Sequence, residues 1–390
     1  MSTPDRAGAA RGPASIRDVA ELAGVSPGTA SKALNHRGSL RPQTIERVLA
    51  ASEQLGYRPN ELVRGIFGRR SFTVGLITTD SFGRFSGPVM AGAEDALDSG
   101  ELSVIMCDSR GDPDRERRHL TTLLGRRIDG LIVTGRCSNP RPPIASSLPF
   151  PVVYAHTPST DPRDCSVMVD DEGAGRLAAR HLIEVGRRGV GHITGPPDFD
   201  AVTRRAAGLA NGLHEAGLTV IGGTRTGDWS EAWGRAAATG LFSEHPDVDA
   251  IYCGSDLIAR GVLDALAAAG VCVPDRIAVV ATDNWALIAR AARPSLTTVD
   301  MRLHEVGHLA ARFLIDAIEG RAISGRHVVP AEIVVRASTG LPYLDAEADA
   351  PLRYHDFCIH EPRASSVDGT AGAPSRRSAS STIRPSGPRT

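Results

Sequence analysis

The sequence predicts an α/β protein, with a small all-α head at the N-terminus and a larger two-lobed body built on parallel sheets. In residues 15–55, three short stretches carry apolar residues at helical spacing and show no strand pattern. From residue 72 onward, short apolar runs alternate with amphipathic stretches of ten or more residues, the pattern of parallel sheets covered by helices. Because this body of roughly 270 residues exceeds what one open sheet usually needs, we expect two lobes with a cleft between them.

The head begins with two short helices joined by a tight turn. Ser15 can cap the first helix, and the charge of Asp18 suits a helix N-terminus. Gly24 ends that helix, and Ser26 can cap a second one in which Pro27 occupies the first turn. This spacing gives the outline of a helix-turn-helix, a motif that places its second helix in the major groove of DNA.

The second helix has one small polar face. Ala30, Ala33 and Leu34 are placed to pack inward. The outward positions are Gly28, Thr29, Ser31, Lys32 and Asn35. The alternative is an ordinary amphipathic pair, completed by the third helix that we expect over residues 42–55, with no nucleic-acid role.

Charge is distributed unevenly along the chain. Residues 1–70 hold eleven Arg or Lys and six Asp or Glu, whereas the remainder holds 33 and 39. A basic head on an acidic body suits a module that meets phosphate, although a solvated surface would give the same balance. Lys32, the only lysine of the chain, falls on the predicted second helix.

The body is predicted element by element from its alternating pattern. Predicted strands are residues 74–77, 103–107, 130–134, 152–155, 167–169, 190–194, 250–253, 277–281, 296–299 and 328–335, each a short apolar run. Predicted helices are residues 88–99, 115–124, 173–185, 202–216, 231–242, 257–269 and 303–319, each with an apolar stripe. Ligands of such folds bind where polar residues terminate the strands.

Composition sets the boundaries and the compartment. We expect disorder in residues 1–14, a helix-turn-helix domain in 15–58, a hinge helix and linker in 59–71, the body in 72–341 and a disordered tail in 342–390. The hinge helix, residues 61–67, is too short to be stable alone and needs DNA or a second copy. No apolar run is long enough to span a bilayer and residues 1–14 lack a secretory signal, so we expect a cytoplasmic protein without membrane contact. The six cysteines are scattered without a CxxC pair, which argues against a zinc ribbon or a disulfide framework.

Several fragments match one known family in the same order. The head reads Asp-Val-Ala from residue 18, ends its second helix with Leu-Asn at residues 34–35, and continues with Leu-Gly-Tyr-Arg-Pro-Asn at 55–60. The body reads Arg-Ile-Asp-Gly-Leu-Ile at 127–132 and Pro-Ser-Leu-Thr-Thr-Val at 294–299. With these fragments the chain resembles the LacI/GalR family of bacterial ligand-responsive transcriptional repressors, over roughly residues 14–340.

The resemblance implies a homodimer that reads a pseudo-palindromic operator in double-stranded DNA, since two-fold protein symmetry requires two-fold half-sites. It assigns base reading to Pro27, Gly28 and Lys32. It places near the phosphates Ser15, Ser26, Thr29, Ser31, Asn35 and His36. In the hinge it marks Arg64 and Ile66, the latter as a wedge in the minor groove. Lys32 stands where Arg is common in the family and lacks the bidentate fork for guanine.

For the body, the resemblance implies a periplasmic-binding-protein-like fold that binds a small-molecule effector, which we expect to be a sugar, and it implies no cofactor. The implied effector positions are Asp80, Phe85, Thr134, His156, Met168, Arg205, Trp229, Ser255 and Asp283. Asp283 and Arg205 can bond ring hydroxyls by charge-assisted hydrogen bonds, and Trp229 offers a flat apolar face. His156 and Ser255 depart from the usual Asp and Asn. Effector binding would shift the orientation of the lobes and so change operator affinity for carbohydrate-related genes.

Two alternatives belong to other functional classes. His304-Glu305-Val306-Gly307-His308 is a literal H-E-x-x-H, the signature of zinc proteases. The motif lies in a helix with its own apolar stripe and lacks the further histidine, so we expect no metal and no enzyme. The second alternative is a sugar-binding component of a transporter, against which the basic head and the missing signal sequence argue.

Overall fold

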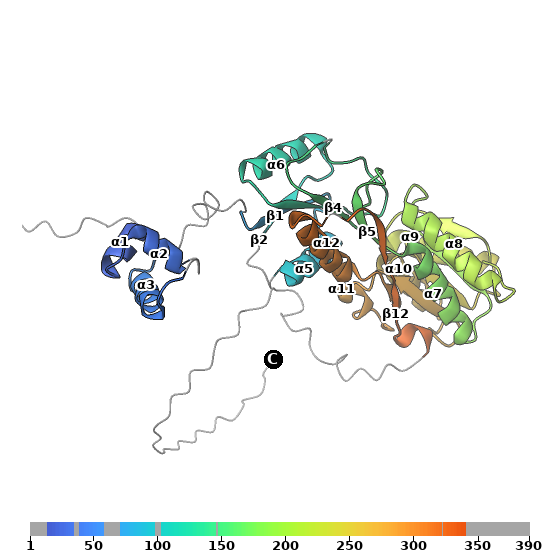
Figure 1. The fold of residues 1–390 in the computed structure, drawn as a ribbon. Helices are drawn as coiled ribbons and strands as arrows, with labels where there is room; N and C mark the ends of the chain where they lie inside the picture. The colour runs from blue at the N-terminus through green and yellow to red at the C-terminus, as the bar shows by residue number, and fades with distance from the viewer. Residues whose placement is uncertain are drawn as a thin grey trace, which may run out of the picture. The chain divides into compact units, whose positions relative to one another are not determined.

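We describe the protein from a computed structural model, which covers residues 14–34, 39–57, 71–97, 103–145, 147–321 and 323–340. Three short helices form the head: α1 (Ile16–Leu22), α2 (Pro27–Leu34) and α3 (Pro42–Gln54) (Figure 1). All three confirm predicted helices. The predicted hinge helix lies outside the described residues, as do residues 1–13 and all of residues 341–390, which include the last residue of the predicted body and the predicted tail.

The caps predicted for the head are present. The Ser15 backbone N–H donates to Asp18 Oδ2 at 2.7 Å, and the Asp18 N–H points back to Ser15 Oγ at 3.4 Å, which makes a capping box. Ser26 Oγ accepts from the Thr29 N–H at 3.1 Å at the start of α2. Gly24, with φ of 63°, makes the turn between the helices in the left-handed region that favours glycine.

The head is held by a small core of short side chains. Ala30 and Ala33 on α2 are fully buried, and they pack with Val19 of α1 and Val48 of α3. The short alanine side chains let the three helices approach closely around a core that contains no large residue at its centre. The inward face predicted for the second helix is therefore confirmed, and Lys32 stays exposed.

The body contains two six-stranded sheets. In the first, which defines the N-terminal lobe, the strand order is β11-β5-β4-β3-β1-β2. Its strands are β1 (Thr73–Thr78), β2 (Ser103–Asp108), β3 (Gly130–Thr134), β4 (Val152–Ala155), β5 (Cys165–Val169) and β11 (Gly325–Val329). In the second, which defines the C-terminal lobe, the order is β12-β10-β9-β8-β6-β7. Its strands are β6 (Val190–Thr194), β7 (Thr224–Thr226), β8 (Ala250–Cys253), β9 (Ala278–Thr282), β10 (Thr297–Asp300) and β12 (Glu332–Val334).

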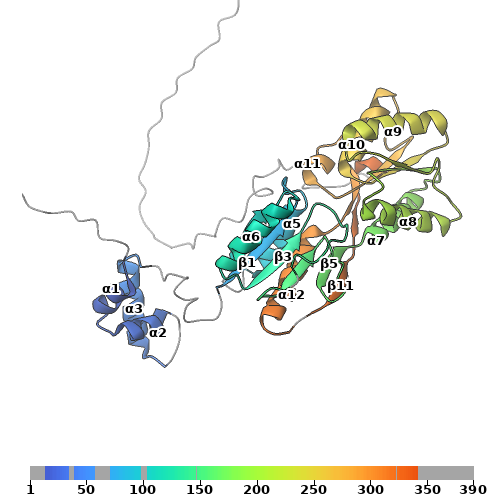
Figure 2. The same ribbon diagram turned by 90° about the horizontal axis from the view of Figure 1, so that it is seen from above.

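Helices cover both faces of each sheet (Figures 1 and 2). Around the first sheet these are α5 (Ser86–Leu97), α6 (Pro113–Gly125) and α12 (Leu303–Ile318). Around the second they are α7 (Asp171–Glu184), α8 (Asp200–His214), α9 (Glu231–Glu244) and α10 (Asp256–Ala268). One buried apolar cluster joins the α5–α12 and α7–α8 layers of both lobes, while α6 and the α9–α10 pair close separate clusters on the opposite faces. Among the described residues, no helix has both the length and the apolar character to cross a membrane.

One predicted strand, residues 328–335, is wrong. The structure divides it at Pro330, which has no N–H to give to a sheet. The first part becomes β11, parallel to β5 in the N-terminal lobe, with His327 opposite Val167. The second part becomes β12, antiparallel to β10 in the C-terminal lobe, with Ile333 opposite Val299. The chain therefore passes between the lobes at this point, as it also does after β5 and after β10.

Three short elements were not predicted. They are the edge strand β7, the helix α11 (Ala286–Ala289) and the 3-10 turn η2 (Ala337–Thr339). Each has four residues or fewer, too few to show a hydrophobic period. The other strands and helices of the body lie where they were expected, and the sheets are parallel apart from β12.

Candidate functional site

The head presents an exposed face on α2. Pro27, Gly28 and Lys32 are exposed, and nothing but Ser26 Oγ lies within 4 Å of the position that a Gly28 side chain would take. The hydroxyls of Ser15, Ser26 and Thr29 take part in the caps of α1 and α2. Ser31 is half-buried on the same helix. Four predicted DNA contacts, Asn35, His36, Arg64 and Ile66, lie outside the described residues.

In the body, most predicted effector residues lie at or just beyond the carboxyl ends of strands. Asp80 follows β1, Thr134 ends β3 and His156 follows β4 in the N-terminal lobe. Ser255 follows β8 and Asp283 follows β9 in the C-terminal lobe. Parallel strands bring such residues to one edge of each sheet, where α/β folds bind ligands.

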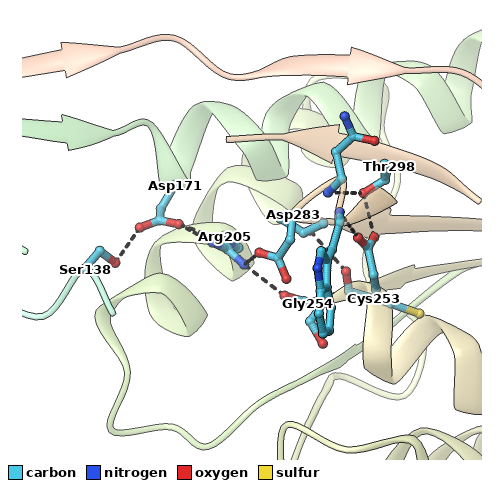
Figure 3. A network of polar contacts seen from close by, with 12 residues as sticks. Ser138, Asp171, Arg205, Cys253, Gly254, Asp283 and Thr298 are labelled. Carbon is cyan, nitrogen blue, oxygen red and sulfur yellow. Dashed lines mark hydrogen bonds and ion pairs between the residues drawn. The ribbon is translucent and has the colours of Figure 1, made fainter. Parts of the chain in front are cut away.

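A buried ion network organises the C-terminal lobe side (Figure 3). Arg205 on α8 donates through Nε to Asp171 Oδ1 at 2.8 Å, and its Nη2 lies 2.8 Å from the same oxygen. Its Nη1 donates to the Gly254 carbonyl at 2.9 Å and lies 3.9 Å from Asp283 Oδ1. Burial disfavours the charge of this guanidinium, but Asp171 and Asp283 outweigh burial and raise the pKa of Arg205.

Two glycines position this network. A Cβ on Gly175 of α7 would collide with the carbonyl oxygen of Arg205, and a Cβ on Gly208 of α8 would collide with that of Glu172. Because neither residue has a side chain, the backbones of α7 and α8 touch at this crossing. The contact sets Asp171, the first residue of α7, beside Arg205 on α8.

The same glycine arrangement recurs in two other helix pairs, Gly92 with Gly307 between α5 and α12, and Gly234 with Gly261 between α9 and α10. In each pair the glycine faces the carbonyl of the residue three positions before the partner glycine. The crossing beside Arg205 is thus one of three helix crossings, among the described residues of the body, at which paired glycines let the helix backbones touch.

Asp256 is a second buried carboxylate near the network. Its Oδ2 accepts from the Trp285 N–H at 2.6 Å and its Oδ1 from the Thr298 hydroxyl at 2.8 Å. Burial and the charge of Asp283 raise the pKa of Asp256 to about 8. Burial also raises the pKa of Asp283, opposed by Arg84 and Arg205. Asp256 is therefore mostly protonated at neutral pH, because burial and the charge of Asp283 both disfavour its ionised form.

The N-terminal lobe side is organised around stacked rings. His156 stacks on Phe85 with ring centroids 5.4 Å apart, and the Phe85 N–H donates to Asp80 Oδ2 at 2.7 Å. His156 is buried, and neither of its ring nitrogens has a hydrogen-bond partner in the described part of the chain. Burial lowers the pKa of His156 to about 4, so the ring is neutral. Thr134 Oγ1 is likewise buried without a partner among the described residues.

Two of the predicted effector residues have unusual backbone conformations. His156 has φ of 68° and Asp283 has φ of 107°, in the region that residues other than glycine rarely adopt. One lies at the end of β4 and the other at the end of β9, in different lobes. Backbone conformations of this strained kind are common at functional sites, where the surrounding structure holds them in place.

A residue that the sequence analysis missed connects the two sides. Arg84, which precedes Phe85 in the loop after β1, forms an ion pair through Nη2 with Asp283 Oδ2. Its guanidinium carbon lies 5.0 Å from the Phe85 ring centroid and 5.1 Å from that of Trp285. A further link between the lobes runs from Ser138 Oγ to Asp171 Oδ2 at 2.7 Å. The two lobes therefore have polar contacts with each other at both ends of the Arg205 network.

The remaining predicted residues have local roles that can be described. Ser255 Oγ accepts from the Ile258 N–H at 3.2 Å and caps α10. Trp229 packs edge-to-face on Phe199, 5.6 Å between centroids, and lies against Gly195, where a side chain would collide with the indole. Met168 is buried in β5. Contact between these side chains and an effector stays a prediction.

The H-E-x-x-H segment takes part in helix packing. His304 Nε2 pairs with Asp95 Oδ2 of α5 at 2.8 Å, and a Cβ on Gly307 would collide with the Val89 carbonyl oxygen. Within the described ranges, no group of three His, Cys, Asp or Glu residues is arranged to hold a metal ion. The motif lies in α12 at its contact with α5.

Comparison with known proteins matches both parts of the chain. Residues 15–60 match the family described as bacterial regulatory proteins, lacI family, and residues 179–339 match a periplasmic binding protein-like domain. The HTH-type transcriptional regulator CelR of Thermobifida fusca is 32% identical over 333 residues, covering 82% of this chain and 96% of CelR. The ribose operon repressor of Escherichia coli K12 is 32% identical over 310 residues, covering 78% and 93%.

Solved structures give the same answer. A transcriptional regulator CelR–cellobiose complex aligns with a TM-score of 0.58 at 30% identity, covering 83% of this chain and 99% of that one. The lac repressor dimer bound to operator and the anti-inducer ONPF aligns with a TM-score of 0.70 at 25% identity, covering 84% and 99%. The similarity therefore extends over both the head and the body.

Proposed function

We propose, from the premise that this chain belongs to the lacI family of bacterial regulatory proteins, that it represses carbohydrate-related genes under the control of a sugar. The relatives that match over most of its length are transcriptional regulators and repressors rather than hydrolases or transporter components. The observation that carries the proposal is the presence, in one chain, of a three-helix head whose second helix is exposed and of a two-lobed body with buried ion pairs between and beside its sheets.

We infer that the head binds operator DNA as one of two copies. The lac repressor, which this chain resembles in fold, was solved as a dimer on its operator, and two-fold symmetry then implies a pseudo-palindromic site. Pro27, Gly28 and Lys32 would face the base edges. With a short pyrrolidine, a glycine and one lysine, this face reads few bases directly, so DNA deformability would supply part of the specificity. The site of action would be the cytoplasm, where the DNA is.

We infer that the effector is a neutral sugar bound between the lobes. Asp283 and Arg205 would bond its hydroxyls, His156 and Thr134 would complete their unsatisfied hydrogen bonds with it, and Phe85 and Trp229 would offer apolar faces. Asp80, Met168 and Ser255 would line the same cleft. CelR, a relative, was solved with cellobiose, which makes this sugar the first candidate. Binding would shift the balance between two lobe arrangements and thereby operator affinity.

The DNA-binding half of the proposal is tested by gel shift with the DNA upstream of the protein's own gene, at two salt concentrations. We expect binding that weakens steeply with salt, with a slope of about −0.9 per neutralised phosphate. Lys32→Ala is expected to weaken binding by about 1–3 kcal/mol if Lys32 reads a base. Arg118→Ala, which removes an exposed charge from the body, is the matched control and should leave binding unchanged. Absence of any shift, with sugar binding intact, would refute the repressor function.

The effector half is tested by thermal unfolding with cellobiose and ribose, the sugars named by two relatives. A sugar at 100 times its dissociation constant should raise the free energy of unfolding by about 2.7 kcal/mol. A shift with Arg205→Ala equal to that of the unmutated protein would show that the sugar binds elsewhere.

A further inference from the structure

The cleft of the protein is filled in part by one of its own side chains. Arg84 extends from the loop after β1 in the N-terminal lobe and pairs with Asp283, which follows β9 in the C-terminal lobe. Its guanidinium lies near two aromatic rings, 5.0 Å from Phe85 and 5.1 Å from Trp285. The side chain is only 15% exposed. A planar cation is thus enclosed by a carboxylate and two aromatic faces from both lobes.

These surroundings are those that a sugar requires. A carboxylate accepts hydrogen bonds from ring hydroxyls, and aromatic faces pack on the C–H faces of the ring. Asp283 and Phe85, which belong to the proposed effector site, are the same groups that Arg84 contacts. A sugar ring can take the space beside Asp283 and the two aromatic rings only when the guanidinium of Arg84 leaves it.

Of the two guanidiniums beside Asp283, Arg84 is the one held by fewer bonds. Arg205 donates through Nε and Nη2 to Asp171 and through Nη1 to a backbone carbonyl. Arg84 has its ion pair with Asp283, but its buried Nε has no hydrogen-bond partner among the described residues. A buried donor without a partner costs free energy in the closed arrangement, so less is lost when Arg84 withdraws toward water than when Arg205 does.

We propose that Arg84 is an internal competitor of the effector, and that it determines which ligands the cleft accepts and how tightly. In the effector-free protein, Arg84 holds the two lobes together through Asp283. An effector binds by offering Asp283 hydroxyl donors and by taking the place between Phe85 and Trp285. The identity of the effector as a sugar rests on the proposed function, whereas the occupation of the cleft by Arg84 does not.

Displacement also changes how the lobes are connected. The Arg84–Asp283 pair links them at one end of the network, and the Ser138–Asp171 hydrogen bond links them at the other. When the effector replaces Arg84, the first link passes through the ligand while the second stays within the chain. The orientation of the lobes then depends on the shape of the ligand, which gives the ligand differential interaction with the two arrangements.

The first experiment needs no effector. In the full-length protein with Arg84→Ala, we expect backbone hydrogen exchange near Phe85 and Trp285 to rise several-fold, because the cleft is no longer closed. Guanidinium chloride at a few millimolar, at constant chloride, should enter the vacated place and reverse the rise. Arg118→Ala, which removes an exposed arginine, should show neither effect. Unchanged exchange in Arg84→Ala, or an equal guanidinium effect in both variants, would overturn the proposal.

The second experiment measures competition, by calorimetric titration with cellobiose and with ribose. If Arg84 fills the cleft nine-tenths of the time, its removal should tighten sugar binding about tenfold. Arg84→Lys keeps the charge that pairs with Asp283 but loses the planar face of the guanidinium. The sugar affinity of this variant should therefore lie between those of the unmutated protein and Arg84→Ala. This variant also covers the case in which Arg84→Ala is too unstable to study.

The outcomes separate the two proposals. Weaker sugar binding by Arg84→Ala would make Arg84 a ligand-binding residue and would overturn competition. Binding of neither sugar to any variant would count against the sugar function, while guanidinium rescue of Arg84→Ala would still support the internal competitor.

Discussion

The two sides of the candidate effector site, which we call its C-terminal and N-terminal walls after the lobes that form them, differ in how their polar groups are paired. On the C-terminal lobe side, the charged groups are already paired: Arg205 contacts Asp171, Gly254 and Asp283. On the N-terminal lobe side, Asp80 accepts from backbone N–H groups, but both nitrogens of His156 and the Oγ1 of Thr134 are buried without a partner among the described residues. Pairing makes the first wall part of the folded structure, whereas unsatisfied atoms make the second wall a place that a ligand completes.

The difference predicts that stability and binding are separable by mutation. Groups of the C-terminal wall should contribute to both, because their partners are other groups of the protein. Groups of the N-terminal wall should contribute to binding alone, because their partners come with the ligand. Variants of Arg205 and His156 are therefore the sharpest ways to break the comparison.

Arg205→Ala is expected to have the largest effect. It leaves Asp171 as a buried carboxylate without its main partner, and breaking a buried ion pair in this way costs about 3–5 kcal/mol. Urea unfolding at neutral pH measures the loss. The matched control is Arg163→Ala, whose pair with Asp161 has an arginine side chain 88% exposed, so its loss should change stability little. Equal costs for the two variants would mean that the C-terminal wall is not a structural unit.

The next effect is a pH dependence of opposite sign for the two walls. Burial lowers the pKa of His156 to about 4, so the unfolded chain binds its proton first and stability is lost as pH falls from 6.5 to 4. Burial and Asp283 raise the pKa of Asp256 to about 8, so its contribution is fully present below about pH 4 and is lost as pH rises from 4 to 8. Since one pKa unit corresponds to about 1.4 kcal/mol, the loss caused by His156 should be on the order of 3 kcal/mol and that caused by Asp256 should be larger.

Two variants isolate these arms by urea unfolding across pH. Relative to the unmutated protein, His156→Phe should become more stable as pH falls from 6.5 to 4. Asp256→Asn keeps an acceptor for Thr298 or Trp285 and should become more stable, relative to the unmutated protein, as pH rises from 4 to 8. The same sign of pH dependence in both stability differences would contradict the assignment of one titrating group to each side.

Much of the fold could be predicted because its signals are local. The caps of Ser15 and Ser26 act within three residues, and a buried parallel strand such as β3 is an unbroken apolar run. The strand predicted over residues 328–335 was wrong for a related reason. Its apolar pattern continues past Pro330, but the two halves belong to different sheets, and pairing partners distant in sequence leave no local signal.

The site could be predicted only in part, and the misses share a cause. Family resemblance pointed to Arg205 and Asp283, which the structure brings within 3.9 Å. It did not point to Arg84. The partner of Arg84, Asp283, is 199 residues away, and an arginine next to an aromatic residue is not a recognisable motif. It also missed Asp171, which reads as a helix-starting acidic residue, although Gly175 and Gly208 fix it beside Arg205.

His156→Phe is expected to have the smallest effect on stability and a clear effect on binding. Phenylalanine keeps the ring that stacks on Phe85 and removes two buried nitrogens that have no partner in the described part of the chain. The removal of these nitrogens stabilises the variant. The backbone has the opposite effect, because a φ of 68° is adopted more readily by histidine than by phenylalanine. These terms nearly cancel, so we expect the free energy of unfolding at neutral pH to change by at most about 1 kcal/mol.

Effector affinity, measured by titration calorimetry with whichever sugar binds, should instead fall about tenfold, because a lost hydrogen bond costs about 1 kcal/mol and a tenfold change about 1.4. His192→Phe is the matched control. His192 is also buried and stacked, 5.1 Å from Tyr252, and it differs from His156 in that its Nδ1 is paired with Thr224 Oγ1 within the C-terminal lobe and only its Nε2 lacks a partner among the described residues. That variant should retain affinity. If instead His156→Phe destabilised the protein and left affinity unchanged, the nitrogens of His156 would not bind the effector. The distinction between the two sides would then be wrong.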